Sequence, residues 1–185
     1  MNEFSLYVLD ITMNSVRAGA TEIKVSLQEE GGWLRFSVED NGCGMTAEQV
    51  AKLRDPFFTT RKTRNVGLGV PFLRMLSEMT EGEVTIESRD KESYPESHGT
   101  KITATFRLDH IDFIPLGDLC GTVVTLVQGS PDIDFTYTHK NELGEVRLSC
   151  AEISAVLGSE ISLASPEILQ WIREYLAEQY EMIKK

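Results

Sequence analysis

The stretch Asp40-Asn41-Gly42-Cys43-Gly44-Met45 directly follows Trp33–Glu39, a run in which apolar and polar residues alternate. Such alternation is typical of a β-strand with one buried face, so the stretch is the turn that leaves the strand. Two glycines one residue apart allow the backbone to approach a ligand closely, and an Asp carboxylate at a strand end can accept a hydrogen bond from an exocyclic amine such as adenine N6. The alternative is an ordinary strand-to-helix turn, because Asp-Asn-Gly is also common turn chemistry.

Regular patterns on both sides of this turn predict the surrounding elements. Residues at helical spacing indicate amphipathic helices, and alternating or β-branched runs indicate strands. Together they favour an α+β fold with helices on one face of a mixed, mainly antiparallel sheet. The elements expected in the first 108 residues are a helix over Phe4–Ala18, a hairpin of Glu22–Gln28 and Trp33–Glu39, helices over Thr46–Leu53 and Val70–Met79, and strands over Glu83–Arg89 and Thr100–Leu108.

A boundary is expected near Asp109–Pro115, where a strand-like run ends and proline and glycine interrupt the pattern. It divides the chain into residues 1–108 and a small α+β extension over residues 109–185. Strands are expected in the extension over Gly121–Gln128, Asp134–His139 and Glu145–Ser149, followed by a closing helix over Ser165–Ile183. The apolar stripe of that helix either packs on the first unit or forms a surface for a protein partner or a second copy of the chain.

Composition and charge exclude several classes of protein. The chain has 185 residues, 41% of them hydrophobic, and a net charge of -11, of which residues 1–108 carry -3 and residues 109–185 carry -8. The apolar content is sufficient for a buried core, and the acidity disfavours nucleic-acid binding, which depends on Lys and Arg. No apolar run reaches the ~20 residues needed to cross a bilayer, so a cytoplasmic protein without membrane contact is expected. The three cysteines are widely spaced and are expected to be reduced thiols.

Two further clusters carry polar chemistry. Asp10 and Asn14 are four residues apart and therefore share one face of the first helix, where they could orient water and offer oxygen to Mg²⁺. The alternative is a solvated polar pair. Farther along, Arg61, Lys62 and Arg64 precede Gly67-Leu68-Gly69 at the start of a helix, where backbone amides and nearby cations can bind phosphate oxygens.

Taken together and in this order, the clusters of residues 1–108 resemble the GHKL superfamily, which includes DNA gyrase, heat-shock chaperones, histidine kinases and the mismatch-repair protein MutL. Asp10–Ala20 is similar to the family's N box, in wording closest to the MutL branch, and Asp40–Met45 is similar to the G1 box. Asp55–Arg61 is similar to the F box of histidine kinases, Gly67–Val70 to their G2 box, and Gly99-Thr100 to the last conserved element.

The resemblance implies a Bergerat-type two-layer α/β sandwich that binds ATP or ADP, with Mg²⁺ held by Asn14. By the same resemblance, Asp40 contacts adenine, Asp10 stands where the family's general base often lies, and Arg61 or Lys62 contacts phosphate. Cys43 lies inside this loop and is expected to be a small buried thiol rather than a reactive one. The other implied nucleotide-binding residues are Gly42, Gly44, Met45, Phe58, Thr59, Thr60, Gly67, Leu68, Gly69, Val70 and Thr100.

The expected function is that of a stand-alone ATP-binding, kinase-like regulator of another protein, because the sequences of the F-box-like and G2-box-like segments resemble those of histidine kinases. None of His98, His110 and His139 has the context of a phosphoacceptor. Two alternatives stay open. One is an ATPase that uses lid closure or dimerisation as a switch. The other is a non-hydrolysing nucleotide sensor, because Asp10 is one methylene shorter than Glu and a misplacement of about 1 Å can cost ~100-fold in rate.

Overall fold

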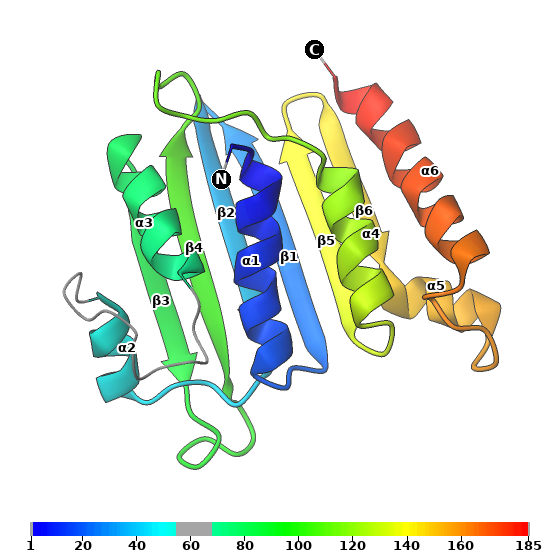
Figure 1. The fold of residues 1–185 in the computed structure, drawn as a ribbon, viewed down its shortest axis with the longest axis horizontal. Coiled ribbons are helices and arrows are strands. Elements are labelled where there is room, and N and C mark those ends of the chain that lie inside the picture. Colours follow the sequence, from blue (N-terminus) through cyan, green and yellow to red (C-terminus); the bar gives the residue numbers. More distant parts are fainter. Residues whose placement is uncertain (1, 55–67, 185) are drawn as a thin grey trace.

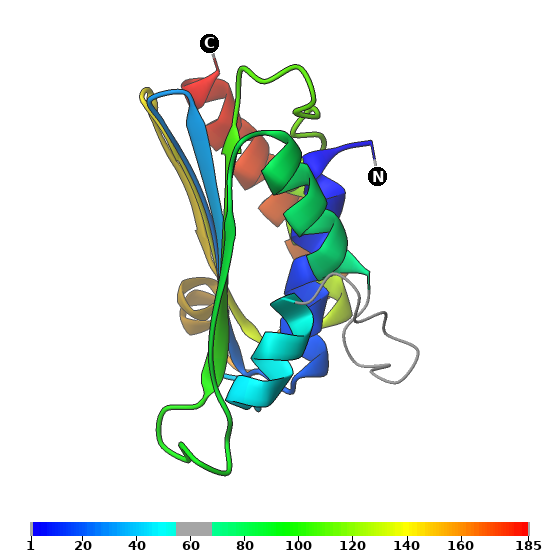
Figure 2. The ribbon, with the colours of Figure 1, turned by 90° about the vertical axis from the view of Figure 1, so that its left-hand side faces the viewer.

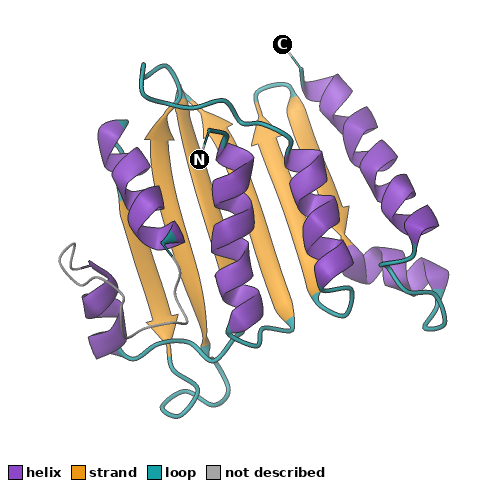
Figure 3. Ribbon diagram, viewed as in Figure 1, coloured by secondary structure: helices purple, strands orange, loops and turns teal. Residues whose placement is uncertain are grey.

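The computed structural model describes residues 2–54 and 68–184 and shows one sheet with helices packed against it (Figures 1 and 3). The strands are β1 (Glu22–Glu30), β2 (Trp33–Asp40), β3 (Val84–Arg89), β4 (Gly99–Arg107), β5 (Asp134–Asn141) and β6 (Gly144–Ser149). The helices are α1 (Phe4–Arg17), α2 (Ala47–Arg54), α3 (Gly69–Met79), α4 (Leu119–Gly129), α5 (Cys150–Leu157) and α6 (Pro166–Ile183).

The sheet is mixed and mainly antiparallel, with the strand order β3-β4-β2-β1-β5-β6. Only the pair β1 and β5 among the described strands is parallel, and it joins the first 108 residues to the rest of the chain. The β1–β2 turn has positive φ at Gly31 (+59°) and Gly32 (+82°), the conformation of a tight hairpin that glycine adopts without strain. The fold class predicted from the sequence is therefore confirmed, and residues 109–185 continue the same sheet. Whether they form a separate unit stays a prediction.

The core lies between one face of the sheet and the helices α1, α3, α4 and α6 (Figure 2). Phe4 of α1 packs edge-on against Phe36 of β2 and Phe106 of β4, with ring centroids 5.4 and 5.0 Å apart. Alternate residues of the strands, such as Ser26 and Ser37, face away from these helices, which explains the period of two in the sequence. In the part of the chain that the structure describes, no helix is both long and apolar enough to span a membrane.

The strand expected over Gly121–Gln128 is wrong, because this segment belongs to helix α4. Its β-branched residues favour a strand, but Asp118 caps the helix by accepting a hydrogen bond from Gly121 N at 2.8 Å. The buried residues recur at helical spacing, and the Thr122 hydroxyl donates to the Ser5 carbonyl of α1 at 3.2 Å. Tertiary packing on α1 therefore overrides the local β preference.

The closing helix α6 was predicted correctly, whereas the short helix α5 was not predicted. The apolar stripe of α6 is divided between two environments. Ile172 and Leu176 are fully buried where α6 packs against β6 and α4, whereas Trp171 and Tyr175 stack on each other on the exposed side. The stripe thus packs mainly on elements of residues 109–185.

Candidate functional site

Asp40 ends β2 and is the centre of a hydrogen-bonded junction between three elements. Its Oδ1 accepts from the backbone N of Gly42 at 2.9 Å and from the backbone N of Thr100 at 3.3 Å. Its Oδ2 accepts from the hydroxyl of Ser15, in α1, at 2.5 Å. These donors fix the orientation of the half-buried carboxylate.

The segment 40–46 after β2 lies tightly against the ends of β3 and β4. A Cβ on Gly44, which has a φ of +66°, would lie 1.9 Å from the Arg89 carbonyl oxygen, and a Cβ on Gly99 would lie 2.0 Å from the Asp40 carbonyl oxygen. Gly42 has Ala18 as its neighbour, 2.8 Å from the position of a Cβ. The sequence suggested that glycine allows a ligand to approach, but here its observed effect is that two protein segments approach each other.

The other side of the junction is α1. Asp10 and Asn14 lie one turn apart on this helix, as predicted. A Cβ on Gly69, the first residue of α3, would lie 2.7 Å from Asp10 Oδ2, so the Asp10 carboxylate adjoins the start of α3. The Asn14 Nδ2 is buried and has no hydrogen-bond partner within the described residues, while its Oδ1 accepts from Arg17 at 3.2 Å. An unpartnered buried amide beside a charged junction is the kind of group that a ligand satisfies.

A pair of hydroxyl groups, from Ser88 and Thr100, connects the segment 40–46 to β3 and β4. The Ser88 Oγ accepts from Met45 N at 2.8 Å and also contacts the Thr100 Oγ1 at 2.8 Å. The short helix α2 follows, and reciprocal bonds between Thr46 and Gln49 form a capping box at its start. Ser15 and Ser88 were not predicted as site residues. Ser15 directly follows Asn14, but no local pattern pairs Ser88 with Met45.

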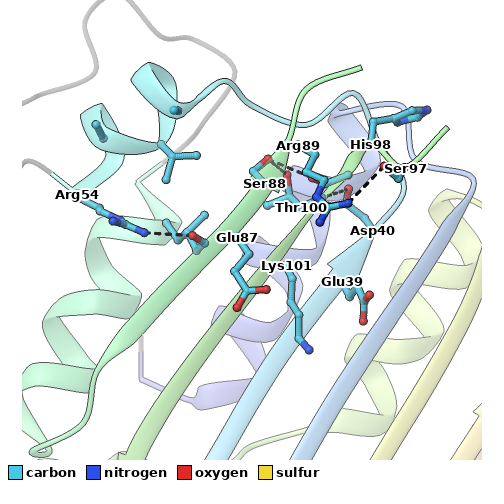
Figure 4. A pocket seen from close by; sticks show the side chains of 15 residues that line it. Glu39, Asp40, Arg54, Glu87, Ser88, Arg89, Ser97, His98, Thr100 and Lys101 are labelled. Carbon is cyan, nitrogen blue, oxygen red and sulfur yellow. Dashed lines mark hydrogen bonds between the residues drawn. The ribbon is translucent and has the colours of Figure 1, made fainter. Parts of the chain in front are cut away.

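An open pocket of about 920 Å³ lies between α2 and the ends of β3 and β4. Figure 4 shows Arg54 on the α2 side and Asp40, Ser88 and Thr100 close together across the pocket. Arg54 donates to the Ile86 carbonyl at 3.3 Å. Of the predicted site residues, Asp40 and Thr100 line this pocket, while Asp10, Asn14 and Gly69 lie outside its lining.

Several predicted residues cannot be placed at this site. Phe58, Thr59, Thr60, Arg61, Lys62 and Gly67 lie outside the described residues. Leu68 is exposed, and Val70, the second residue of α3, is buried in the core. The expectation for Cys43 is wrong, because its side chain is exposed in the turn after Asp40 and not buried. Within residues 2–54 and 68–184, no three His, Cys, Asp or Glu side chains form a metal-binding group.

The fold and the junction define a two-layer α/β domain whose polar pocket lies between α2, the ends of β2 and β3 and the start of β4. The chain belongs to the family of histidine kinase-, DNA gyrase B- and HSP90-like ATPases, whose model matches residues 3–110. The resemblance to the GHKL superfamily is thereby confirmed.

Sequence relatives of the chain include histidine kinases. The chain is 32% identical over 84 residues to the signal transduction histidine-protein kinase AtoS of Escherichia coli K12, covering 44% of this chain and 14% of AtoS. It is 37% identical over 84 residues to the sensor histidine kinase ZraS of Klebsiella oxytoca, covering 44% of this chain and 18% of ZraS. The chain therefore corresponds to less than a fifth of either kinase.

Solved structures extend the likeness of fold beyond the family match. The ATPase domain of Aquifex aeolicus MutL, solved with ADP, aligns with 96% of this chain and 70% of its own, at a TM-score of 0.55 and 16% identity. The N-terminal domain of a DNA repair protein aligns with 86% of this chain and 58% of its own, at a TM-score of 0.57 and 14% identity. The fold that they share with this chain includes most of residues 109–185, for which no family motif was found in the sequence.

Proposed function

We propose that the chain binds ATP and ADP with Mg²⁺ between α1, the segment 40–46 and the start of α3. The observation that carries this proposal is the Asp40 junction, in which Ser15 joins the carboxylate to α1. Beside it lies the buried amide nitrogen of Asn14, which has no hydrogen-bond partner within residues 2–54 and 68–184. Asp40 would accept a hydrogen bond from the adenine amine, and Asn14 would supply an oxygen to Mg²⁺. The residue types fit these roles, because a charged acceptor, a carboxamide and a helix start meet at one place. Bound ATP would supply a transferable γ-phosphoryl group.

In this proposal the nucleotide-binding role of the remaining predicted residues follows the family boxes. Gly42, Gly44 and Met45 shape the segment after β2, and Thr100 holds Asp40. Leu68 is the N-cap of α3, and Gly69 and Val70 begin the helix, where helix N-terminal amides favour phosphate. Asp10 adjoins that helix start and is the proposed catalytic carboxylate.

The activity that we propose is that of a kinase-like regulator of another protein. Its support is the likeness of an 84-residue stretch of the chain to histidine kinases. All three histidines already have partners on this chain, and His110 accepts from the backbone N of Asp112. His139 is 2% exposed and bonds Glu29, and His98 bonds the Gly42 carbonyl. A phosphoryl acceptor on a separate protein is therefore favoured.

Calorimetry of ATP and ADP binding, with and without Mg²⁺, tests the proposal. Asp40→Asn should weaken binding at least ~10-fold, because a charge-assisted hydrogen bond is worth about 1.5–3 kcal/mol. Asp132→Asn is the matched control, because Asp132 is an exposed carboxylate in the turn before β5. Binding by neither the wild type nor the control would overturn the proposal, as would wild-type affinity in Asp40→Asn.

The alternative is an ATPase whose nucleotide-driven closure or dimerisation works as a switch, and the whole-chain fold likeness to the MutL ATPase domain favours it. Steady release of phosphate that Asn14→Ala abolishes would support this alternative over the kinase. A non-hydrolysing sensor is the third candidate. It would be supported if the wild type binds ATP without turnover and Asp10→Glu creates turnover, and excluded by rapid wild-type hydrolysis.

A further inference from the structure

His98 lies at the end of the loop between β3 and β4 and faces the segment 40–46. Its Nδ1 is 2.5 Å from the carbonyl oxygen of Gly42. A carbonyl oxygen only accepts hydrogen bonds, so the Nδ1 of His98 carries the proton and donates. His98 also lines the pocket next to Asp40 and Thr100, and Figure 4 shows these residues on the same side of it.

The contact matters because Gly42 has no side chain to restrict its backbone. Its N–H donates to the Asp40 carboxylate and its C=O accepts from His98, so the peptide groups on both sides of its Cα are held. Glycine explores a wide range of φ and ψ, and outside contacts must therefore fix its conformation. Ala18 leaves no space at Gly42 for a side chain that could restrict the backbone instead.

The loop that carries His98 is ordered by its own bonds. Asp90 Oδ2 accepts from Ser93 N at 3.0 Å, which lowers the pKa of Asp90, and Tyr94 N donates to the Asp90 carbonyl at 2.9 Å. The Arg89 guanidinium lies 5.4 Å from the centroid of the Tyr94 ring. The same loop donates from Lys91 N to the Cys43 carbonyl at 2.9 Å. His98 thus extends from a structured loop.

We infer that His98 is a positioning residue of the nucleotide site, which fixes Gly42 and through it the Asp40 carboxylate for recognition of an adenine nucleotide. The inference rests on the proposed function for its ligand. His98 acts through Gly42 and Asp40, so its loss weakens binding without removing a group that touches the base.

Substitutions distinguish this role from simple filling of space. Asn carries its amide nitrogen on Cγ, as His carries Nδ1, whereas the amide nitrogen of Gln is one bond farther away and corresponds to Nε2. His98→Ala should weaken ADP binding about 2- to 10-fold, the value of one hydrogen bond, and His98→Asn should restore it to within about twofold. His98→Gln should remain as weak as His98→Ala. His110→Ala is the control, because His110 makes its Nδ1 contact with Asp112 N in the turn after β4.

The second measurement needs no nucleotide. The exchange rate of the Gly42 amide, followed by NMR, should rise in His98→Ala and His98→Gln and return to the wild-type rate in His98→Asn. The inference is overturned if His98→Ala leaves the Gly42 exchange rate unchanged, or if Gln rescues as well as Asn. Absence of ADP binding in the wild type would instead contradict the proposed function, while the exchange rates would still decide the role of His98.

Discussion

Gly44 illustrates how one residue can be required by the protein's own packing. Its φ is +66°, and a Cβ there would lie 1.9 Å from the Arg89 carbonyl oxygen. Gly44→Ala should therefore lower the free energy of unfolding by at least about 2 kcal/mol, through backbone strain and displacement of β3. Urea denaturation measures this loss.

The matched control for Gly44 is Gly129, the last residue of α4. A Cβ at Gly129 has no atom within 4 Å, and its φ is not positive. Gly129→Ala should change the free energy of unfolding by no more than about 1 kcal/mol, and in the stabilising direction, because alanine is the better helix former. Equal losses in the two variants would show that the contact with Arg89 does not determine the choice of glycine.

Some residues of the site could be predicted from the sequence and others could not. Asp40 and Asn14 could be found because each stands in a recognisable local pattern. Ser88 and His98 could not, because their partners Met45 and Gly42 are 43 and 56 residues away and meet them only once β3 and β4 are in register. Cys43 was assigned wrongly because local sequence does not reveal which side of a turn faces solvent.

At the scale of elements, helix α4 depends on its cap. Asp118 accepts a hydrogen bond from Gly121 N, and the helix that follows is rich in β-branched residues that favour strands. Asp118→Ala should lower the free energy of unfolding by about 0.5–2 kcal/mol, measured by urea denaturation. The control is Ser165→Ala before α6, because Ser165 makes no side-chain capping bond and should lose a few tenths of a kcal/mol at most. A larger loss for Ser165→Ala would contradict this account.

The same helix shows why some elements could be predicted and others could not. The hairpin of β1 and β2 alternates with a clear period of two, and glycine marks its turn, so local signals agree with the final fold. In α4 the β-branched run points to a strand, and the Asp118 cap together with packing on α1 and α6 decides otherwise. Helix α5, at Cys150–Leu157, follows β6 without a break and has only one fully buried residue, so its amphipathic signal is weak.

At the scale of the whole molecule, buried thiol and phenol groups should make the free energy of unfolding fall as the pH becomes alkaline. Burial raises the pKa of the Cys150 thiol from 9.0 to about 11 and raises the pKa of Tyr137 and of Tyr180. The folded state therefore keeps protons that the unfolded state loses. The stabilisation is fully present below pH ~9 and is lost as the pH rises through the folded pKa of Cys150.

For Cys150 this loss should amount to about 2 kcal/mol between pH 8 and pH 10.5, at 1.36 kcal/mol per unit of pKa. Urea denaturation at the two pH values measures it. Cys150→Ala should remove this part of the pH-dependent loss in the free energy of unfolding. Cys43→Ala, at an exposed thiol, should leave the loss unchanged. A wild-type slope that Cys150→Ala does not reduce would show that other groups are responsible.

The parallel pairing of β1 with β5 has a consequence for how this molecule could be cut or recombined. β1 lies inside the sheet, and residues 22–28 pair with residues 134–140 of β5. A fragment that ended at the predicted boundary near Asp109 would keep all four strands of the family region but would leave that side of β1 without backbone partners. An uncovered strand of this length is a template for intermolecular pairing. Excision or domain shuffling at this boundary would therefore favour aggregation, although the sequence pattern there resembles a domain boundary.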